Sequence, residues 1–283
     1  MPDRPASNTA VGVATLRAAH QILDGPPRVL DDTVVVQLLG PETTARVREH
    51  ADRFADRRAS GLRAHVLLRS RYAEERLHLA VERGVKQFLV LGAGLDTFAY
   101  RQPEWAHGLR IYEVDHPTSQ DAKRERLAAG SISIPGNVTF VSVDFEHETL
   151  RDRLTANGFD FTVPTFVSCL GVLVYLTMDA VTDLFRFIAS LTPSSEFVFT
   201  FGGHPRPLPP GVPSLAEIVA ASGEPFRSAL DIDEVGRLCA EVGLSAPVVP
   251  TESEIASYMG DRRDGLQPPT HNSIASVMVA PRL

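Results

Sequence analysis

The chain contains few of the residues that cross-link a small protein or bind a metal. Only two cysteines occur among its 283 residues, Cys169 and Cys239, and they lie far apart in apolar surroundings. A disulfide framework and a CxxC metal pair are therefore excluded. None of the nine histidines stands in an HExxH or other paired spacing, so we expect no bound metal. This cysteine usage is typical of the cytoplasm, where we expect the protein to act.

Positive charge is also scarce. The chain has 28 lysines and arginines against 35 aspartates and glutamates, a net charge of -7 and a pI near 5.7. Such a chain lacks the electrostatic footprint of a nucleic-acid or anionic-membrane binder. No apolar run reaches membrane-spanning length, and residues 1–20 lack the basic start and apolar core of an export signal. We therefore expect neither a nucleic-acid partner nor a membrane partner.

The remaining composition is typical of a soluble enzyme with one main domain, because 43% hydrophobic residues can build a full core. From residue 85 onward, strand and helix patterns alternate, which predicts βαβ units. The expected class is α/β, with a Rossmann-like, doubly wound, mostly parallel sheet and helices on both faces. The expected parts of this single domain, residues 1–283, are a helical N-terminal cap (1–84), a cofactor-binding core (85–201), an inserted lid or substrate loop region after the fifth strand (202–230) and a C-terminal completion of the core (231–283).

Local signals predict where these elements begin and end. Gly84 predicts the end of the N-terminal helices. The segment GGHPRPLPPGVP at 202–213 is too rich in proline and glycine for a regular element. Asp231 and Glu234 form a capping box, and Gly243 supplies the helix stop. The predicted strands cover 87–91, 110–114, 138–143, 165–170, 196–201 and 273–281, and further helices lie near 119–129, 147–157 and 178–191.

The segment QFLVLGAGLDTFAYR, residues 87–101, is the most informative one. An apolar run of strand length ends in a glycine turn, which an acidic residue follows at once. Gly92 and Gly94 permit backbone dihedrals and a close ligand approach that a side chain would block. Asp96 would repel a pyrophosphate docked on the following amides, but not a cationic or zwitterionic ligand. The turn therefore predicts a nucleotide-like ligand of the second kind.

Three later strand-like segments end in the same way. IYEVDHP reaches Asp115, VTFVSVDF reaches Asp144, and TFVSCLGVLVYLT contains Leu170. In an open parallel sheet the ligand binds beyond the carboxyl ends of the strands. We therefore expect these three residues and Gly92 to converge on one site.

The motifs LGAGLDTFAYR, YEVDHP, VDF and LGVLVYLT, in this order, resemble the leucine carboxyl methyltransferase family of class I S-adenosylmethionine methyltransferases. The resemblance is strongest to the bacterial branch with polyketide-type O-methyltransferases, and it covers residues 60–200 best. It implies S-adenosyl-L-methionine as cofactor, a Rossmann-like fold, and O-methylation of a carboxyl or hydroxyl group of a small-molecule substrate. The backbone of Gly92, Ala93 and Gly94, with Asp96, would border the cofactor.

The resemblance also implies roles at the strand ends. Asp115 follows Gly92 by 23 residues, where an acidic side chain accepts the two ribose hydroxyls; Glu113 faces the same side and is the alternative. Asp144 and Phe145 occupy the place of the pair beside adenine, although the family usually has leucine second. Asp144 could equally cap the helix expected near residue 147.

The amino acid end of the cofactor requires a carboxylate anchor. Arg69 matches the family arginine that grips this carboxylate, since its planar fork suits bidentate binding. Arg71 is the nearby alternative, and Arg17 is a weaker match to a second basic anchor. Leu170 stands where many members have a glutamate facing the cofactor ammonium. Backbone carbonyls around Leu170 could accept from that ammonium instead.

No catalytic side chain is identified. Tyr175 borders the expected substrate side or is simply packed. His204 follows the fifth strand and could take the proton of a hydroxyl substrate, or it is a surface histidine. A nicotinamide-dependent oxidoreductase remains an alternative, although Thr97 occupies the third glycine position of its fingerprint. A non-catalytic cofactor-binding protein is a second alternative, motivated by Leu170. The sequence does not reveal the oligomeric state.

Overall fold

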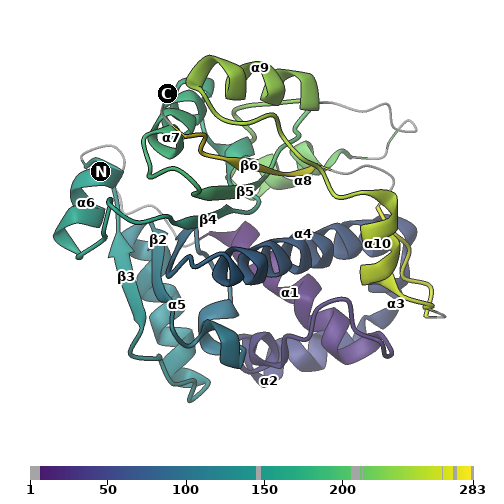
Figure 1. Ribbon diagram of the computed structural model, residues 1–283. Helices are drawn as coiled ribbons and strands as arrows, with labels where there is room; N and C mark the ends of the chain where they lie inside the picture. Colours follow the sequence, from purple (N-terminus) through teal and green to yellow (C-terminus); the bar gives the residue numbers. More distant parts are fainter. Residues whose placement is uncertain are drawn as a thin grey trace.

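The computed structural model describes residues 7–144, 148–204, 211, 213–262, 264–269 and 273–281. These residues contain one six-stranded sheet in the order β3-β2-β1-β4-β5-β6 (Figure 1). The strands are β1 (Gln87–Leu91), β2 (Arg110–Asp115), β3 (Val138–Ser142), β4 (Phe166–Cys169), β5 (Glu196–Thr200) and β6 (Ile274–Met278).

The sheet is parallel except at one edge, where β6 pairs antiparallel with β5. Strand β1 lies between β2 and β4, so the strand order reverses between β1 and β4. In an open α/β sheet the ligand crevice lies at this reversal, beyond the carboxyl ends of the strands. The predicted mostly parallel, Rossmann-like sheet is confirmed, and every predicted strand is present with its ends shifted by at most a few residues.

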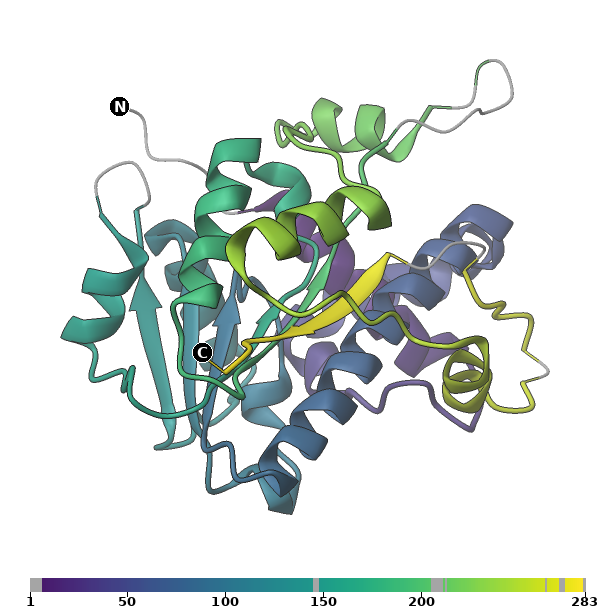
Figure 2. The same ribbon diagram turned by 45° about the horizontal axis from the view of Figure 1, so that its top comes forward.

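Helices cover both faces of the sheet, as predicted (Figures 1 and 2). Because side chains alternate along a strand, Leu89 and Leu91 pack with α6, α7 and α9, whereas Phe88 and Val90 pack with α4. The helices are α1 (Asn8–Leu23), α2 (Thr33–Glu49), α3 (Ala51–Ala55), α4 (Arg57–Glu82), α5 (Pro117–Ala129), α6 (Leu150–Ala156), α7 (Met178–Ala189), α8 (Leu215–Ala221), α9 (Ile232–Val242) and α10 (Glu252–Met259), with short 3-10 turns η1 (Phe98–Tyr100), η2 (Glu104–Ala106) and η3 (Leu173–Tyr175).

The predicted helix signals hold with one exception. The reciprocal capping box of Asp231 and Glu234 is formed, and Gly243 ends α9 in the left-handed conformation at φ 80°. Gly84 follows α4 at φ 94°. Asp144 does not cap α6, because that helix starts later than expected and Thr149 accepts from the Asp152 amide instead. Of the segment 202–213, residues 205–210 and 212 lie outside the described residues, and those described form no helix or strand.

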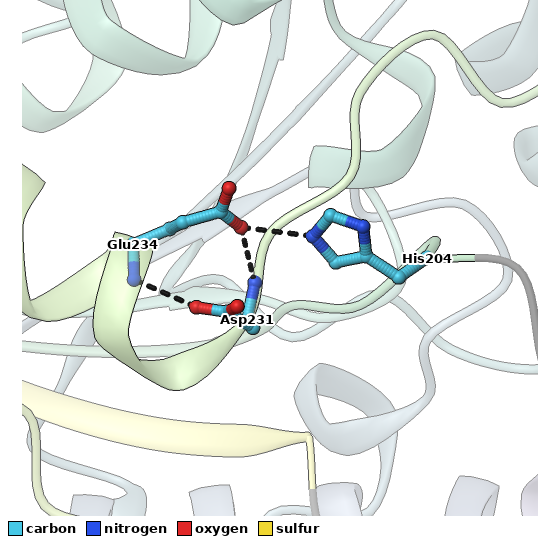
Figure 3. A group of neighbouring side chains, drawn as sticks. All are labelled: His204, Asp231 and Glu234. Atoms are coloured by element: carbon cyan, nitrogen blue, oxygen red, sulfur yellow. Dashed lines mark hydrogen bonds and ion pairs between the residues drawn. The ribbon is translucent and has the colours of Figure 1, made fainter.

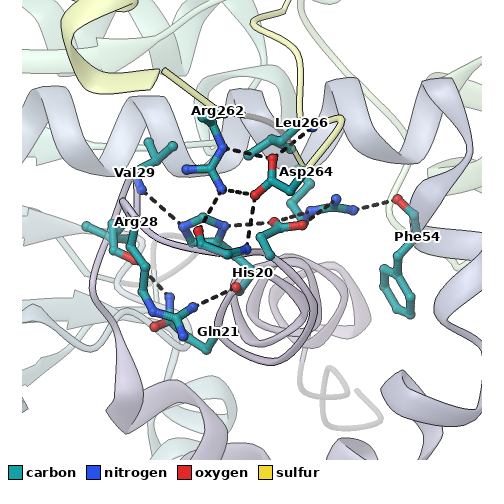
Figure 4. A network of polar contacts seen from close by, with 12 residues as sticks. His20, Gln21, Arg28, Val29, Phe54, Arg262, Asp264 and Leu266 are labelled. Carbon is teal, nitrogen blue, oxygen red and sulfur yellow. Dashed lines mark hydrogen bonds and ion pairs between the residues drawn. The ribbon is translucent and has the colours of Figure 1, made fainter. Parts of the chain in front are cut away.

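A buried polar network fixes the connection between α1 and α2 (Figure 4). Arg63 of α4 donates from Nε and Nη2 to the two oxygens of Asp24, each at 3.0 Å. His20 Nδ1 lies 2.8 Å from Asp24 Oδ2, and the Val29 amide donates to His20 Nε2 at 3.1 Å. Burial alone would raise the pKa of Asp24, but the His20 hydrogen bond and the charge of Arg63 lower it. The network therefore holds α1 against α4.

The N-terminal helices and the segment after β5 meet above the carboxyl edge of the sheet. Ser7 Oγ and the Asn8 amide, at the start of α1, donate to the two carboxylate oxygens of Glu224 at 3.0 and 2.9 Å. The Arg227 amide donates to the Val174 carbonyl at 2.7 Å. Residues before and after the core thus cover one edge of the sheet together. Among the described helices, none is both long and apolar enough to cross a membrane.

Candidate functional site

The glycine turn after β1 is held by the neighbouring strand. The Ala93 amide donates to the Val114 carbonyl at 3.0 Å, and the Gly94 amide donates to Asp115 Oδ2 at 2.5 Å. Gly92 has φ 65°, and a Cβ there would lie 2.3 Å from Val172 Cγ2. The positive φ agrees with the backbone freedom predicted for this glycine, and the segment after β4 also blocks a side chain at this position.

Asp115 lies at the carboxyl end of β2, directly beside this turn. Its Oδ1 accepts from the His116 amide at 2.7 Å, while its Oδ2 accepts from Gly94. Burial raises the pKa of Asp115, in opposition to these two hydrogen bonds and to the charge of Lys123. Each carboxylate oxygen has room for a second donor. The side chain can therefore hold the turn and still accept two hydroxyl groups.

Glu113, the alternative to Asp115, has other partners. It is fully buried, and its Oε2 accepts from Lys123 Nζ at 2.7 Å and from the Tyr100 hydroxyl at 2.8 Å. Its side chain is committed to a buried ion pair beneath the turn. Of the two acidic residues on β2, Asp115 is thus the one whose carboxylate borders the turn itself.

Arg69 reaches the other side of the turn from the middle of α4. Its side chain is half-buried, and a Cβ at Gly171, just after β4, would lie 2.6 Å from its Nη1. Burial, and then the nearby charge of Arg17, lower the pKa of Arg69 to about 10. Arg71 instead lies on the surface, where it pairs with Glu75 at 3.5 Å. The structure therefore brings Arg69, but not Arg71, to the carboxyl edge of β4.

Arg17 is buried but already paired. Its Nε donates to Asp32 Oδ2 at 2.9 Å, and its Nη2 donates to the Leu95 carbonyl at 2.9 Å. Arg101 pairs with Asp32 at 3.4 Å and with Glu74. This network joins α1, α2 and α4 to the turn, and the sequence did not predict it. Its one sequence signal is Arg101, the last residue of the motif LGAGLDTFAYR.

Asp96 borders a small cavity together with Leu170. One oxygen of Asp96 accepts from the Phe98 amide at 2.9 Å, which forms a local turn. The cavity of about 20 Å³ also has Ser168 and the half-buried Glu74 in its wall. It has room for about one water molecule. Two carboxylates thus line the space beside Leu170, although the strand itself supplies none.

A larger cavity of about 140 Å³ lies on the other side of the turn. Gly94 and Leu95 form part of its wall, together with Ser119 of α5 and the first residues of α1, which include Asn8. A Cβ at Gly94 would lie 3.3 Å from the Cβ of Ala10. The start of α1 therefore covers the turn and forms one wall of this cavity.

Asp144 follows β3, on the far side of β2 from the turn. Its backbone amide donates to Glu148 Oε2 at 3.0 Å, and its carbonyl accepts from the Glu148 amide at 2.8 Å. The strand order places it next to the end of β2. Phe145, the predicted second member of this pair, lies outside the described residues. The four strand ends predicted to converge therefore lie at one edge, in the order Asp144, Asp115, Gly92 and Leu170.

His204 turns toward α9 (Figure 3). Its Nε2 lies 2.8 Å from Glu234 Oε2, and that carboxylate also accepts from the Asp231 amide at 2.7 Å. The hydrogen bond from His204 is the main cause that lowers the pKa of Glu234. Candidate ligand atoms of His204, Asp231 and Glu234 lie within 4.8 Å of one another. All three side chains are exposed or half-exposed, and their hydrogen bonds lie at the N-terminus of α9. The imidazole is therefore a surface partner of α9 in this structure.

Both cysteines, Cys169 and Cys239, are buried free thiols. Burial raises the pKa of Cys169 to about 12 and that of Cys239 to about 11. Neither thiol is therefore suited to act as a nucleophile near neutral pH.

Comparison with known proteins points to one family. The profile of the family described as leucine carboxyl methyltransferase matches residues 10–189, more than half of the chain. A Bacillus subtilis (strain 168) protein named "Putative S-adenosyl-L-methionine-dependent methyltransferase YktD" is 37% identical over 183 residues, 63% of this chain and 60% of that protein. A Mycobacterium marinum (strain ATCC BAA-535 / M) protein named "Putative S-adenosyl-L-methionine-dependent methyltransferase" is 35% identical over 211 residues, 70% of this chain and 66% of that protein. The matches thus span somewhat less than two thirds of these relatives.

A solved structure from Thermobifida fusca YX, described as a "putative methyltransferase", resembles the fold. It has a TM-score of 0.55 and 19% identity, and the match covers 98% of this chain and 96% of that one. A likeness at this identity shows the shared fold.

Proposed function

The chain belongs to the leucine carboxyl methyltransferase family, and from this premise we propose that it is an S-adenosyl-L-methionine-dependent methyltransferase. Its acceptor would be a carboxyl or hydroxyl oxygen of a small molecule. The observation that carries the proposal is the placement of Asp115 and Arg69 on opposite sides of the glycine turn. The two side chains carry opposite charges, as the ribose and carboxylate ends of this cofactor require.

The residues at the end of β2 fit the ribose. A ribose diol donates two hydrogen bonds, and each oxygen of Asp115 has one backbone donor and remaining capacity for another. The cavity of about 140 Å³ borders the turn at Gly94 and offers space for part of the nucleoside. We assign the adenine to the neighbouring end of β3, where Asp144 lies. Its exocyclic amine would donate to that carboxylate.

The residues beside β4 are suited to bind the amino acid end of the cofactor. Among the described residues, no hydrogen bond or ion pair is seen for the Arg69 guanidinium, so its planar fork is available to a carboxylate. The ammonium would face Asp96, which borders the same cavity as Leu170. Asp96 from the turn would thereby replace the glutamate that many family members carry at the position of Leu170.

When bound, S-adenosyl-L-methionine would supply a methyl group on a positively charged sulfur: an acceptor oxygen would bond to the methyl carbon as the carbon–sulfur bond breaks, and S-adenosylhomocysteine would leave as a neutral thioether. Asp115 and Arg69 would hold the ribose and carboxylate ends of the cofactor and so fix its orientation at the turn. The start of α1 and the segment around Arg227 cover the edge and exclude water. Alignment and exclusion of water supply most of the rate gain in such a transfer. A carboxylate acceptor would need no base from the protein.

The test is a calorimetric titration of the full chain with S-adenosylhomocysteine and, separately, with NAD. Binding of the first and no binding of the second are expected; the reverse result would favour the nicotinamide-dependent alternative. A turnover assay with methyl-labelled cofactor and a metabolite mixture then identifies the acceptor. Cofactor binding without methylation of any metabolite would leave the non-catalytic alternative as the better account.

A further inference from the structure

Lys123 is a buried lysine behind the proposed cofactor site. It lies on α5 with only 1% of its surface exposed. Its Nζ is 2.7 Å from Glu113 Oε2 and 5.2 Å from the centre of the Tyr100 ring. Burial of an ammonium group costs several kcal/mol unless it is paired. The charge at this position is therefore tolerated because Lys123 is paired with Glu113.

The partners of Lys123 lie on β2, which carries the proposed ribose acceptor Asp115, and on η1, which follows the glycine turn. Glu113 lies two residues before Asp115, so the two side chains leave β2 on the same face. Tyr100 ends η1, which continues the chain from the glycine turn, and its hydroxyl donates to Glu113 Oε2 at 2.8 Å. Gln120, one helical turn before Lys123, donates to the Glu113 carbonyl at 3.0 Å. Lys123 thus joins α5, β2 and the turn at one point.

The electrostatic balance of this cluster extends to Asp115. Glu113 Oε1 is buried and has no hydrogen-bond partner among the described residues, so its carboxylate depends strongly on Lys123. Burial raises the pKa of Glu113 and of Asp115, and the charge of Lys123 opposes both shifts. The other groups that act on Asp115 are the Gly94 and His116 amides and the His116 side chain. Asp96 adds a further negative charge near Glu113.

We infer that Lys123 is a positioning residue for the cofactor: it fixes the end of β2 against the turn through Glu113 and keeps Asp115 ionised for the ribose hydroxyls. The inference rests on the proposed function, because it presumes that Asp115 accepts those hydroxyls. Of this buried pair, Lys123 is the member whose charge lowers the pKa of Asp115. Removal of the lysine charge should therefore change the pH dependence of cofactor binding, whereas removal of only one hydrogen bond to Glu113 should not.

The experiment is a calorimetric titration of the full chain with S-adenosylhomocysteine between about pH 5 and pH 9. The dissociation constant of the wild type should be constant at high pH and should rise on acidification, when Asp115 takes up a proton. In Lys123→Met this acid limb should move up by about one pH unit, with binding near neutrality weakened roughly tenfold.

Two variants serve as controls. Tyr100→Phe removes one hydrogen bond to Glu113 without a change of charge, so it should weaken binding without displacing the limb. Lys123→Arg keeps the charge and should restore the wild-type limb. If Lys123→Met does not fold, Lys123→Gln removes the same charge with a polar side chain and decides the question by the same displacement of the limb.

The outcomes separate the two claims. A wild type that fails to bind S-adenosylhomocysteine at any pH overturns the proposed function and this inference with it. A wild type that binds, together with a folded Lys123→Met or Lys123→Gln variant whose acid limb coincides with that of the wild type, overturns the inference alone. This holds even if the variant binds more weakly, because a purely structural role would give weaker binding without a displaced limb.

Discussion

The Gly94 amide and the Asp115 carboxylate bind each other directly, with 2.5 Å between N and Oδ2. A strand-end side chain thus fixes the turn of the neighbouring strand. Any ligand that Asp115 accepts is consequently placed relative to the turn. Loss of this carboxylate should affect both the ligand and the backbone around it.

Asp115→Ala should weaken the binding of S-adenosylhomocysteine by roughly tenfold to more than a hundredfold, because a hydrogen bond to a charged group contributes about 1.5 to 3 kcal/mol. The thermal unfolding midpoint should fall only modestly, since one backbone amide loses its partner. Calorimetry and thermal unfolding measure the two effects. Asp121→Ala, an exposed change on α5, should alter neither. Unchanged binding in a folded Asp115→Ala variant would refute the ribose assignment.

Arg69→Met should discriminate between two ligands. Binding of S-adenosylhomocysteine should weaken at least about tenfold, because the carboxylate loses a charge-assisted partner. Binding of methylthioadenosine, which lacks the amino acid end, should not change. Arg71→Met provides the matched control, since that side chain lies on the surface of the same helix. Equal losses for both ligands would show that Arg69 supports the site as a whole rather than the carboxylate.

Gly92→Ala should destabilise the fold, because its Cβ would lie 2.3 Å from Val172 Cγ2 and because φ 65° strains a non-glycine residue. We expect a loss of at least about 2 kcal/mol of unfolding free energy, and a larger loss for Gly92→Val. Addition of Val172→Ala should recover part of the loss by removing the contact. Ala93→Gly should be mild. Denaturant unfolding of the four variants gives the free energies; a Val172→Ala change without benefit would mean that strain alone requires the glycine.

Asp24→Asn should lower the unfolding free energy by about 3 kcal/mol at neutral pH, because it breaks the buried pair with Arg63. The folded pKa of Asp24 is lowered, so its stabilisation is complete above the unfolded carboxyl pKa of about 3.9 and is lost as the pH falls through the folded value. The stability difference between wild type and variant should therefore shrink below about pH 4. Urea unfolding at several pH values tests this, and a difference independent of pH would contradict it.

His204→Ala should leave the pH profile of methyl transfer unchanged between about pH 6 and pH 8. The imidazole is bound to Glu234 at the surface of α9, and a carboxylate acceptor is already ionised in this range. Single-turnover rates measure the profile. A rising limb near pH 6.5 in the wild type that disappears in the variant would identify a hydroxyl acceptor with His204 as its base.

The sequence predicted the sheet well because parallel strands are buried on both faces and stand out as apolar runs. The same applies to Asp115 and Arg69, whose places follow from strand ends and a family motif. It could not predict the pairing of Arg17 with Asp32, because that contact joins two helices whose packing no local pattern encodes. Nor could it distinguish the roles of Glu113 and Asp115, which share a face of β2 but differ in burial. The alternative role of Asp144 as the N-cap of α6 is not formed, because the helix starts at Leu150 and Thr149 caps it.

The spacing of residues along helix α4 sets the position of Arg69 at its centre. Arg76 lies two turns after Arg69, about 10 Å along the helix axis. Arg76, and Arg83 just after the end of the helix, form ion pairs with the buried Glu196, each at 2.5 Å. Glu196 begins β5, at the opposite end of the sheet from the glycine turn. The deletion of a single residue between Arg69 and Arg76 would rotate the Arg69 side chain by about 100° around the helix and withdraw it from Gly171. The reach of that guanidinium is thus set by the spacing of residues that lie nowhere near the ligand.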